Sequence, residues 1–318
     1  MITSKSIKIR WITITCFEVV LPSGKVILFD PWLRITDAEK GPHDTDGIET
    51  TLDDLTGADW MFISHAHFDH VADVQLVNEK FMAGTNGGRI FLPALSAYKL
   101  AQRYDIPYRD ILPVYPHETF DFDEFTITAL PCRHRGDPVT PSATAEARRK
   151  RGSTEEEIFL GAIGNLDEID WAVTIKDCNL RFMVLGGGLY HFNNTPNFCR
   201  EFNPLFVTRQ VSHILCDDPH KYAEYCAMYH APFVFPSHHG TVAGEQLPAL
   251  RGFRERDPEG DGLQRPGHQP GTGQMVRDRR LSGEAGLSFL PIPTTHSVHC
   301  YSSLNRTPSA AAGGVLLS

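Results

Sequence analysis

The segment Ser64–His70, which reads Ser-His-Ala-His-Phe-Asp-His, constrains this chain more than any other feature. It places three imidazoles and one carboxylate within six residues, directly after the apolar run Trp60–Ile63. Imidazole and carboxylate groups are the usual protein ligands of zinc, manganese and iron. A polar turn that is rich in histidine by chance is the alternative, but turns favour Gly, Asn, Ser and Pro. The segment therefore predicts a metal site at the end of a strand.

The spacing of the polar residues in this segment has a physical reason. Alternate side chains of an extended stretch point the same way, so His65, His67 and Asp69 can project to one side. His70 follows Asp69 directly and can turn towards a second position nearby. Two neighbouring ligand sets suit a two-metal site, at which a bridging water becomes a nucleophile at neutral pH.

Length and charge limit the classes of protein that fit this chain. Its 318 residues can build one large α/β domain or two small ones. The formal net charge of -9 argues against a general nucleic-acid binder, which would present a basic face. The short basic run at 148–151 is interpreted as a solvated helix end. The chain has no stretch of about 18 apolar residues, so we expect no membrane span.

The seven cysteines are scattered along the chain, and they form no C-x-x-C pair. An odd number of scattered cysteines fits a cytosolic protein with reduced thiols. Lys5, Lys8 and Arg10 interrupt the region in which a secretory signal would need an apolar core. We therefore expect a cytoplasmic protein, with a homo-oligomer as one possible state.

The first 240 residues read as an alternation of strands and helices. Strands are predicted at 7–15, 25–30, 59–64, 89–92, 125–130, 171–176, 181–185, 214–216 and 232–236. Helices are predicted at 71–81, 93–104 and 219–230, and a loop with a short helix at 136–152. A tight turn at 21–24 is predicted to separate the first two strands. This alternation is typical of a layered α/β domain with a mixed sheet.

The composition changes near Gly252, and residues 257–280 have almost no periodic apolar pattern. We therefore expect one domain at 1–250, followed by an atypical, poorly ordered tail at 251–318. Leu287–Ile292 is the one convincing apolar run in this tail. His296 and His299 are interpreted as surface or loop histidines, because such termini are commonly mobile.

Three further positions follow apolar strands and could complete a metal site. They are His134, the pair His238-His239, and the glycines at 186–188. Strand ends gathered at one sheet edge are the common location of α/β active sites.

The order of these motifs resembles the metallo-β-lactamase-fold hydrolases. The H-x-H-x-D-H segment lies between a strand and a helix, and a later His134, a glycine-rich strand end and Pro236–His239 follow. Asp30–Trp32 also resembles the first strand ending of that family. The resemblance covers about residues 7–245 and is strongest to the L-ascorbate-6-phosphate lactonase-type branch. It implies an αββα sandwich with mixed sheets.

The resemblance also implies a ligand set and an activity. The implied metal ligands are, for the first ion, His65, His67 and His134 and, for the second, Asp69, His70 and His238. His239 would contact the substrate or take the last ligand role, and Asp69 could instead act as a general base. The expected cofactor is one or two divalent ions, zinc first, with manganese and iron as alternatives. The expected substrate is a small, anionic lactone, ester or phosphoester.

One departure from the family matters. The family has Gly-Asp after this strand, and that Asp bridges both metals, whereas the equivalent position here is Gly188. His191 could compensate, although a loop histidine is the favoured interpretation. Asp217 and Asp218 could also approach, although N-capping ahead of the following Pro is favoured for Asp218.

Three functions compete on this sequence. A metal-dependent hydrolase is the leading hypothesis. A non-catalytic or decayed binding protein on the same scaffold is the second, because the bridging carboxylate is absent. A nuclease of the same fold is the least favoured, because the chain is acidic and has no extended basic stripe.

Overall fold

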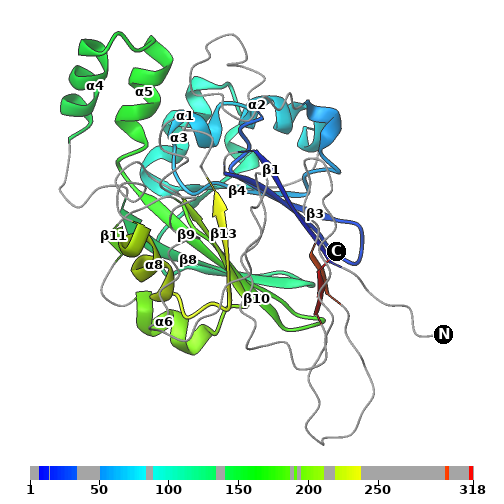
Figure 1. The fold of residues 1–318 in the computed structure, drawn as a ribbon. Helices are drawn as coiled ribbons and strands as arrows, with labels where there is room; N and C mark the ends of the chain where they lie inside the picture. The colour runs from blue at the N-terminus through cyan, green and yellow to red at the C-terminus, as the bar shows by residue number, and fades with distance from the viewer. Residues whose placement is uncertain are drawn as a thin grey trace, which may run out of the picture.

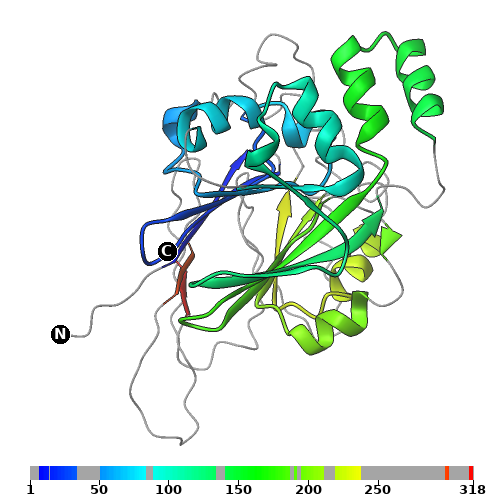
Figure 2. The same cartoon turned by 180° about the vertical axis from the view of Figure 1, so that it is seen from behind.

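The computed structural model describes residues 7–13, 15–33, 51–83, 89–133, 140–186, 190–191, 195–210, 219–237, 298–300 and 315–317. Two β-sheets pack face to face, and helices cover their outer faces (Figure 1). The same layers are seen from behind in Figure 2. This arrangement confirms the predicted αββα sandwich.

The first sheet has six strands in sequence order. They are β1 (Lys8–Thr13), β2 (Cys16–Val20), β3 (Val26–Phe29), β4 (Trp60–Phe62), β5 (Ile90–Pro93) and β6 (Ile111–Val114). The first three pair antiparallel, and β3 to β6 run parallel. The sheet is therefore mixed, as predicted.

The strand predicted at 7–15 is present as β1, but β2, which follows it directly, was not predicted. β1 turns back after Thr13 and pairs with β2, so that Trp11 lies opposite Phe17. The turn at 21–24 joins β2 to β3, not the first strand to the second. Apolar residues continue through this hairpin without Gly or Pro, so the sequence lacks the usual signal of a turn.

The second sheet has seven strands. They are β7 (Thr119–Asp121), β8 (Phe125–Arg133), β9 (Glu168–Ile175), β10 (Leu180–Val184), β11 (Tyr190–His191), β12 (Phe206–Gln210) and β13 (Phe233–Ser237). β10, β12 and β13 are parallel neighbours, so their carboxyl ends lie at one edge. β6, β7, β11 and β12 were not predicted. The predicted strand at 214–216 lies outside the described residues.

The helices occupy the outer layers. They are α1 (Phe68–Val71), α2 (Val74–Val77), α3 (Ala94–Arg103), α4 (Pro141–Lys150), α5 (Glu155–Ile163), α6 (Thr195–Phe202) and α8 (Pro219–Ala227). A short 3-10 helix lies at Leu52–Asp54, another at Tyr108–Asp110, and a π-helical turn at Asn78–Met82. α1, α2 and α3 cover the first sheet, and α6 and α8 cover the second (Figure 1). None of the helices in the described ranges is long and apolar enough to cross a membrane.

The helix predicted at 71–81 begins earlier and is divided in two. The break falls at Asp73, whose backbone N–H donates to the carbonyl of Pro31 at 3.3 Å. Its side chain accepts a hydrogen bond from the Leu33 N–H at 2.6 Å. These tertiary bonds take Asp73 out of the helical ladder, which no local pattern in the sequence indicates.

A helical hairpin of α4 and α5 projects from one corner of the molecule (Figure 2). α4 confirms the short helix predicted within 136–152, whereas α5 was not predicted. Thr154 and Glu157 form a capping box at the start of α5, with both reciprocal hydrogen bonds present. The spacing Thr-x-x-Glu is a readable signal of a helix start in the sequence.

The main core lies between the two sheets and is rich in aromatic side chains. The ring of Phe62 in β4 contacts Phe91 at 4.4 Å and Trp171 of the opposite sheet at 5.1 Å, measured between centroids. A second apolar cluster lies between the first sheet and α1 to α3, and a third between the second sheet and α6 and α8. Both faces of each sheet are thus covered, so polar side chains concentrate at strand ends.

The described part of the tail is small. β14 (Val298–Cys300) and β15 (Val315–Leu317) pair antiparallel, and β14 lies beside β1. His299 lies in β14, not in a loop. The rest of the predicted tail, including Leu287–Ile292 and His296, falls outside the described residues.

Candidate metal centre

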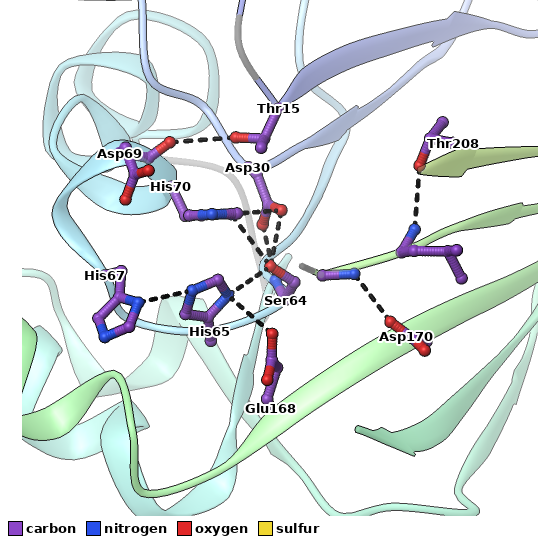
Figure 3. A network of polar contacts seen from close by, with 12 residues as sticks. Thr15, Asp30, Ser64, His65, His67, Asp69, His70, Glu168, Asp170 and Thr208 are labelled. Atoms are coloured by element: carbon purple, nitrogen blue, oxygen red, sulfur yellow. Dashed lines mark hydrogen bonds and ion pairs between the residues drawn. The ribbon is translucent and has the colours of Figure 1, made fainter. Parts of the chain in front are cut away.

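The histidine-rich segment lies where β4 ends and α1 begins. Because β3 and β4 are parallel neighbours, the residues that follow them meet at the same edge of the sheet. Asp30 follows β3, and Ser64 follows β4. Figure 3 shows Asp30, Ser64, His65 and His70 gathered at this edge.

Asp30 is the anchor of this cluster. One carboxylate oxygen accepts the backbone N–H of Ser64 at 2.7 Å. The other oxygen accepts the Ser64 hydroxyl at 2.7 Å and Nδ1 of His70 at 2.9 Å. Asp30 has a φ of +44°, a left-handed conformation that Asp adopts more readily than most residues. The sequence resemblance pointed to Asp30 only as a strand ending, so its bonding role is a finding of the structure.

The buried His70 is held by this carboxylate. Burial lowers the pKa of His70, but the charge of Asp30 and its hydrogen bond raise it by more, so the net pKa lies above its ordinary value. The hydrogen bond assigns a proton to Nδ1 of His70. The nitrogen of this ring that would coordinate a metal is therefore Nε2.

His65 is oriented through Ser64. Its Nδ1 lies 3.0 Å from the Ser64 hydroxyl oxygen. Because that hydroxyl donates its proton to Asp30, its oxygen accepts from the N–H of His65. The unprotonated Nε2 of His65 then faces Nδ1 of His67 at 2.9 Å.

This pair of nitrogens fits one shared ion. Two nitrogens that each lie about 2.0–2.1 Å from a tetrahedral zinc ion are about 3.3–3.4 Å apart, so the two rings need to separate by only about half an ångström to share one. Within the described ranges no three His, Cys, Asp or Glu side chains converge to hold a metal. The predicted ligands His134 and His238, the predicted substrate contact His239, and Gly188 all lie outside those ranges.

Asp69, the fourth polar residue of the segment, lies in the first turn of α1. Its carbonyl accepts a hydrogen bond from the hydroxyl of Thr15 at 3.0 Å, which ties the start of α1 to the turn before β2. Figure 3 shows Asp69 on the same side of the cluster as His70. His191 lies in β11, and Asp217 and Asp218 lie outside the described residues.

Two glycines pack closely against the histidine-rich segment Ser64–His70. A Cβ added at Gly164, at the end of α5, would lie 2.3 Å from Cδ2 of His67 and 2.7 Å from its backbone nitrogen. A Cβ at Gly186, after β10, would lie 2.6 Å from the Cβ of Ser64. Neither position has room for a side chain, so the hairpin helix and the second sheet both set the path of the segment.

A buried polar layer, missed by sequence reasoning, flanks the cluster. It consists of Glu168 and Asp170 of β9 and Arg209 of β12, all almost fully buried. Burial raises the pKa of Glu168 well above its usual range and that of Asp170 to about 6. Asp170 accepts the N–H of Gly186 at 2.8 Å and is attracted by Arg209. Two acids at alternate positions of an apolar strand were the signal that could have revealed this layer.

Sequence comparison places this geometry among known proteins. A model of the Beta-lactamase superfamily domain matches residues 25–175. A UPF0173 metal-dependent hydrolase of Myxococcus xanthus is 22% identical over 255 residues, which cover 77% of this chain and 73% of that protein. A second UPF0173 metal-dependent hydrolase, of Koribacter versatilis, is 33% identical over 76 residues, which cover 24% of this chain and 29% of that protein.

Structural comparison agrees on the fold. Igni18, a metallo hydrolase of Ignicoccus hospitalis, superposes with a TM-score of 0.54 at 15% identity, over 85% of this chain and 98% of its own. A possible metal-dependent hydrolase of Veillonella parvula superposes with a TM-score of 0.53 at 12% identity, over 86% of this chain and 100% of its own. With two mixed sheets between helical layers, the chain has the metallo-β-lactamase fold.

Proposed function

We propose that this chain is a metal-dependent hydrolase that acts on a small lactone, ester or phosphoester. The observation that carries the proposal is the approach of Nε2 of His65 to Nδ1 of His67 at 2.9 Å. Asp30 and Ser64 fix the orientation of the first of these rings. The hydrolase names of the relatives from Myxococcus xanthus and Ignicoccus hospitalis support the same class.

The proposed ligand set extends the described pair. It comprises, for a first divalent ion, His65, His67 and His134 and, for a second, Asp69, His70 and His238. Zinc is the first choice for imidazole-rich ligands, with manganese and iron as alternatives. A bound ion would lower the pKa of a water and polarise the scissile group of the substrate.

The protein side chains have distinct tasks in this scheme. Asp30 keeps the ring protons of His65 and His70 on Nδ1, directly for His70 and through Ser64 for His65, so that each Nε2 is available as a ligand. The carboxylate of Asp69 accepts a proton from the attacking water if it acts as a general base and not as a ligand. His239 contacts the substrate.

The extent of the catalytic unit, the kind of substrate, the cellular location and the oligomeric state are proposed from the sequence. We assign the catalytic unit to residues 1–250 and the substrate to small anionic molecules of the kind that the lactonase-type branch cleaves. A cytoplasmic location suits the thiols, since every described cysteine is free: Cys16, Cys132, Cys178, Cys199 and Cys226. Assembly into a homo-oligomer is compatible with this scheme.

Elemental analysis of the purified protein tests the proposal. We expect one or two equivalents of a divalent metal per chain in the parent and a clear loss in the variant His67→Ala. The control His230→Asn changes an exposed histidine of left-handed backbone, where Asn is tolerated, and should retain the metal. Hydrolysis of a panel of lactones and phosphodiesters should cease on chelation. If the protein binds metal but hydrolyses no substrate of the panel, the proposal of a hydrolase is contradicted.

A second candidate, a binding protein without turnover, follows from Gly188. That position lacks the carboxylate that the resemblance expects, so one or both ions could bind weakly. The variant Gly188→Asp distinguishes a hydrolase from a binding protein without turnover. A large gain in metal content and in activity indicates a decayed enzyme, whereas unchanged activity with full metal content indicates that the parent site is already complete.

A further inference from the structure

Glu168 is a buried carboxylate that the proposed catalytic scheme does not use. It is the first residue of β9, lies opposite Cys132 of β8, and is 4% exposed. One of its carboxylate oxygens lies 3.7 Å from Nδ1 of His65. Figure 3 shows Glu168 reaching towards that ring from β9, whereas Asp30 approaches from β3.

The surroundings of this carboxylate are poor in hydrogen-bond donors. Among the described residues, no nitrogen or oxygen donor lies within hydrogen-bond distance of either of its oxygens, and the neighbouring thiol of Cys132 is only a weak donor. Placing a carboxylate in such an environment costs free energy unless a positive charge compensates it. Among the described residues, the nearest group that can carry such a charge is the ring of His65.

A metal at Nε2 of His65 would provide this compensation. Coordination withdraws electrons from the imidazole and makes its Nδ1–H more positive, so a carboxylate behind that edge is attracted to the ring more strongly when the metal is bound. The distance of 3.7 Å is too long for a hydrogen bond, so the direct partner of Nδ1 is the hydroxyl of Ser64. The contribution of Glu168 is therefore electrostatic.

We propose that Glu168 is a positioning residue for the metal ligand His65, which it stabilises from behind in the metal-loaded state. The inference rests on the proposed function, because it assumes that His65 binds a metal. Glu168 would also compensate in part for the charge of the bridging carboxylate that is missing at Gly188. In the metal-loaded state, an ionised Glu168 would supply one negative charge beside the centre from outside the coordination sphere.

The test compares metal affinity in the full-length chain. Glu168→Gln keeps the shape of the side chain and removes its charge, and Glu168→Asp keeps the charge on a shorter stem. Asp167→Asn is the matched control, because Asp167 is the adjacent acid but accepts the N–H of Leu95 and the hydroxyl of Ser96 at the start of α3. Competition with a chromophoric chelator measures the zinc affinity, and the visible spectrum of the cobalt-substituted protein reports on the ligand field.

We expect Glu168→Gln to weaken zinc binding about 10–100-fold and to shift the cobalt spectrum, as is typical of groups behind a ligand. Glu168→Asp should recover part of the affinity, and Asp167→Asn should leave it unchanged. The melting temperature of metal-free Glu168→Gln should equal or exceed that of the parent. Equal zinc affinity of Glu168→Gln and parent overturns the inference alone, as does a loss of affinity that accompanies unfolding of the metal-free variant. A parent that binds no metal overturns the proposed function as well.

Discussion

The carboxylate of Asp30 accepts a hydrogen bond from Nδ1 of His70 at 2.9 Å, although 40 residues separate the two side chains. The contact exists because β3 and β4 are parallel neighbours whose ends coincide. The same carboxylate holds the backbone and the hydroxyl of Ser64. One acid therefore orients both the start of the histidine segment and its last member.

Replacing Asp30 by Asn should weaken metal binding. Asp30 accepts three hydrogen bonds on two oxygens, whereas an amide offers one acceptor oxygen and would set its NH2 group against the donors Ser64 and His70. We expect a loss of about 10–100-fold in metal affinity, measured by chelator competition. Asp59→Asn is the control, because Asp59 accepts the Val26 N–H at the opposite end of β4. An equal loss in both variants would mean that the effect is general destabilisation.

Replacing Gly164 by Ala should damage the site through packing. The added methyl would overlap His67, and its contacts include two backbone atoms that cannot swing away. Overpacking of this kind costs about 1–3 kcal/mol of stability, which a urea titration can measure. We also expect reduced metal content.

Gly57→Ala provides the comparison for Gly164. A Cβ at Gly57 meets Val26 at 3.4 Å, an ordinary van der Waals contact, so this variant should remain near the parent in both measurements. Full metal content in Gly164→Ala would show that the segment can move without loss of its ligands.

The stability of the metal-free protein should depend on the ionisation of Asp170. Its folded pKa is raised to about 6 by burial, from 3.8 for an exposed group. The folded chain then binds more protons than the unfolded chain between these values, so this carboxyl makes the protein less stable as the pH rises from about 4 to 6. The full effect is about 3 kcal/mol.

Asp170→Asn should remove this dependence. The raised pKa already includes the attraction of Arg209, so a neutral amide should be better tolerated than the ionised acid. We expect the variant to be more stable than the parent by about 1–3 kcal/mol at pH 7.5, and the difference to fall to roughly a third of that value near pH 4.5. Denaturation curves at the two pH values measure it, and a variant less stable than the parent at pH 7.5 would refute the assignment.

Removal of metal should lower the melting temperature of the parent. A ligand that binds only the folded state stabilises it by about 4 kcal/mol when it is present at 1,000 times its dissociation constant. Chelation should therefore shift the thermal transition of the parent downward and leave that of His67→Ala almost unchanged. An equal shift in both proteins would place the stabilising ion elsewhere.

Much of the fold follows from local patterns. The apolar runs before Ser64 and before Pro131 form β4 and β8 as predicted, because burial on both faces needs continuous apolar residues. The hairpin between Thr13 and Cys16 and the break at Asp73 could not be read in the same way. The break at Asp73 depends on bonds with distant residues, and neither feature carries a Gly or Pro signal.

The sequence by itself determined that Ser64–His70 carries the donor groups of a predicted metal site, since it places three imidazoles and a carboxylate in six residues. Only the tertiary structure decided how these groups are held. Asp30, Glu168 and Gly164 come from separate elements, and no spacing along the chain shows that they meet at His65, His67 and His70. The physical reason is that coordination chemistry is encoded in residue type, whereas the orientation of a ring depends on partners that only strand pairing and helix packing bring together.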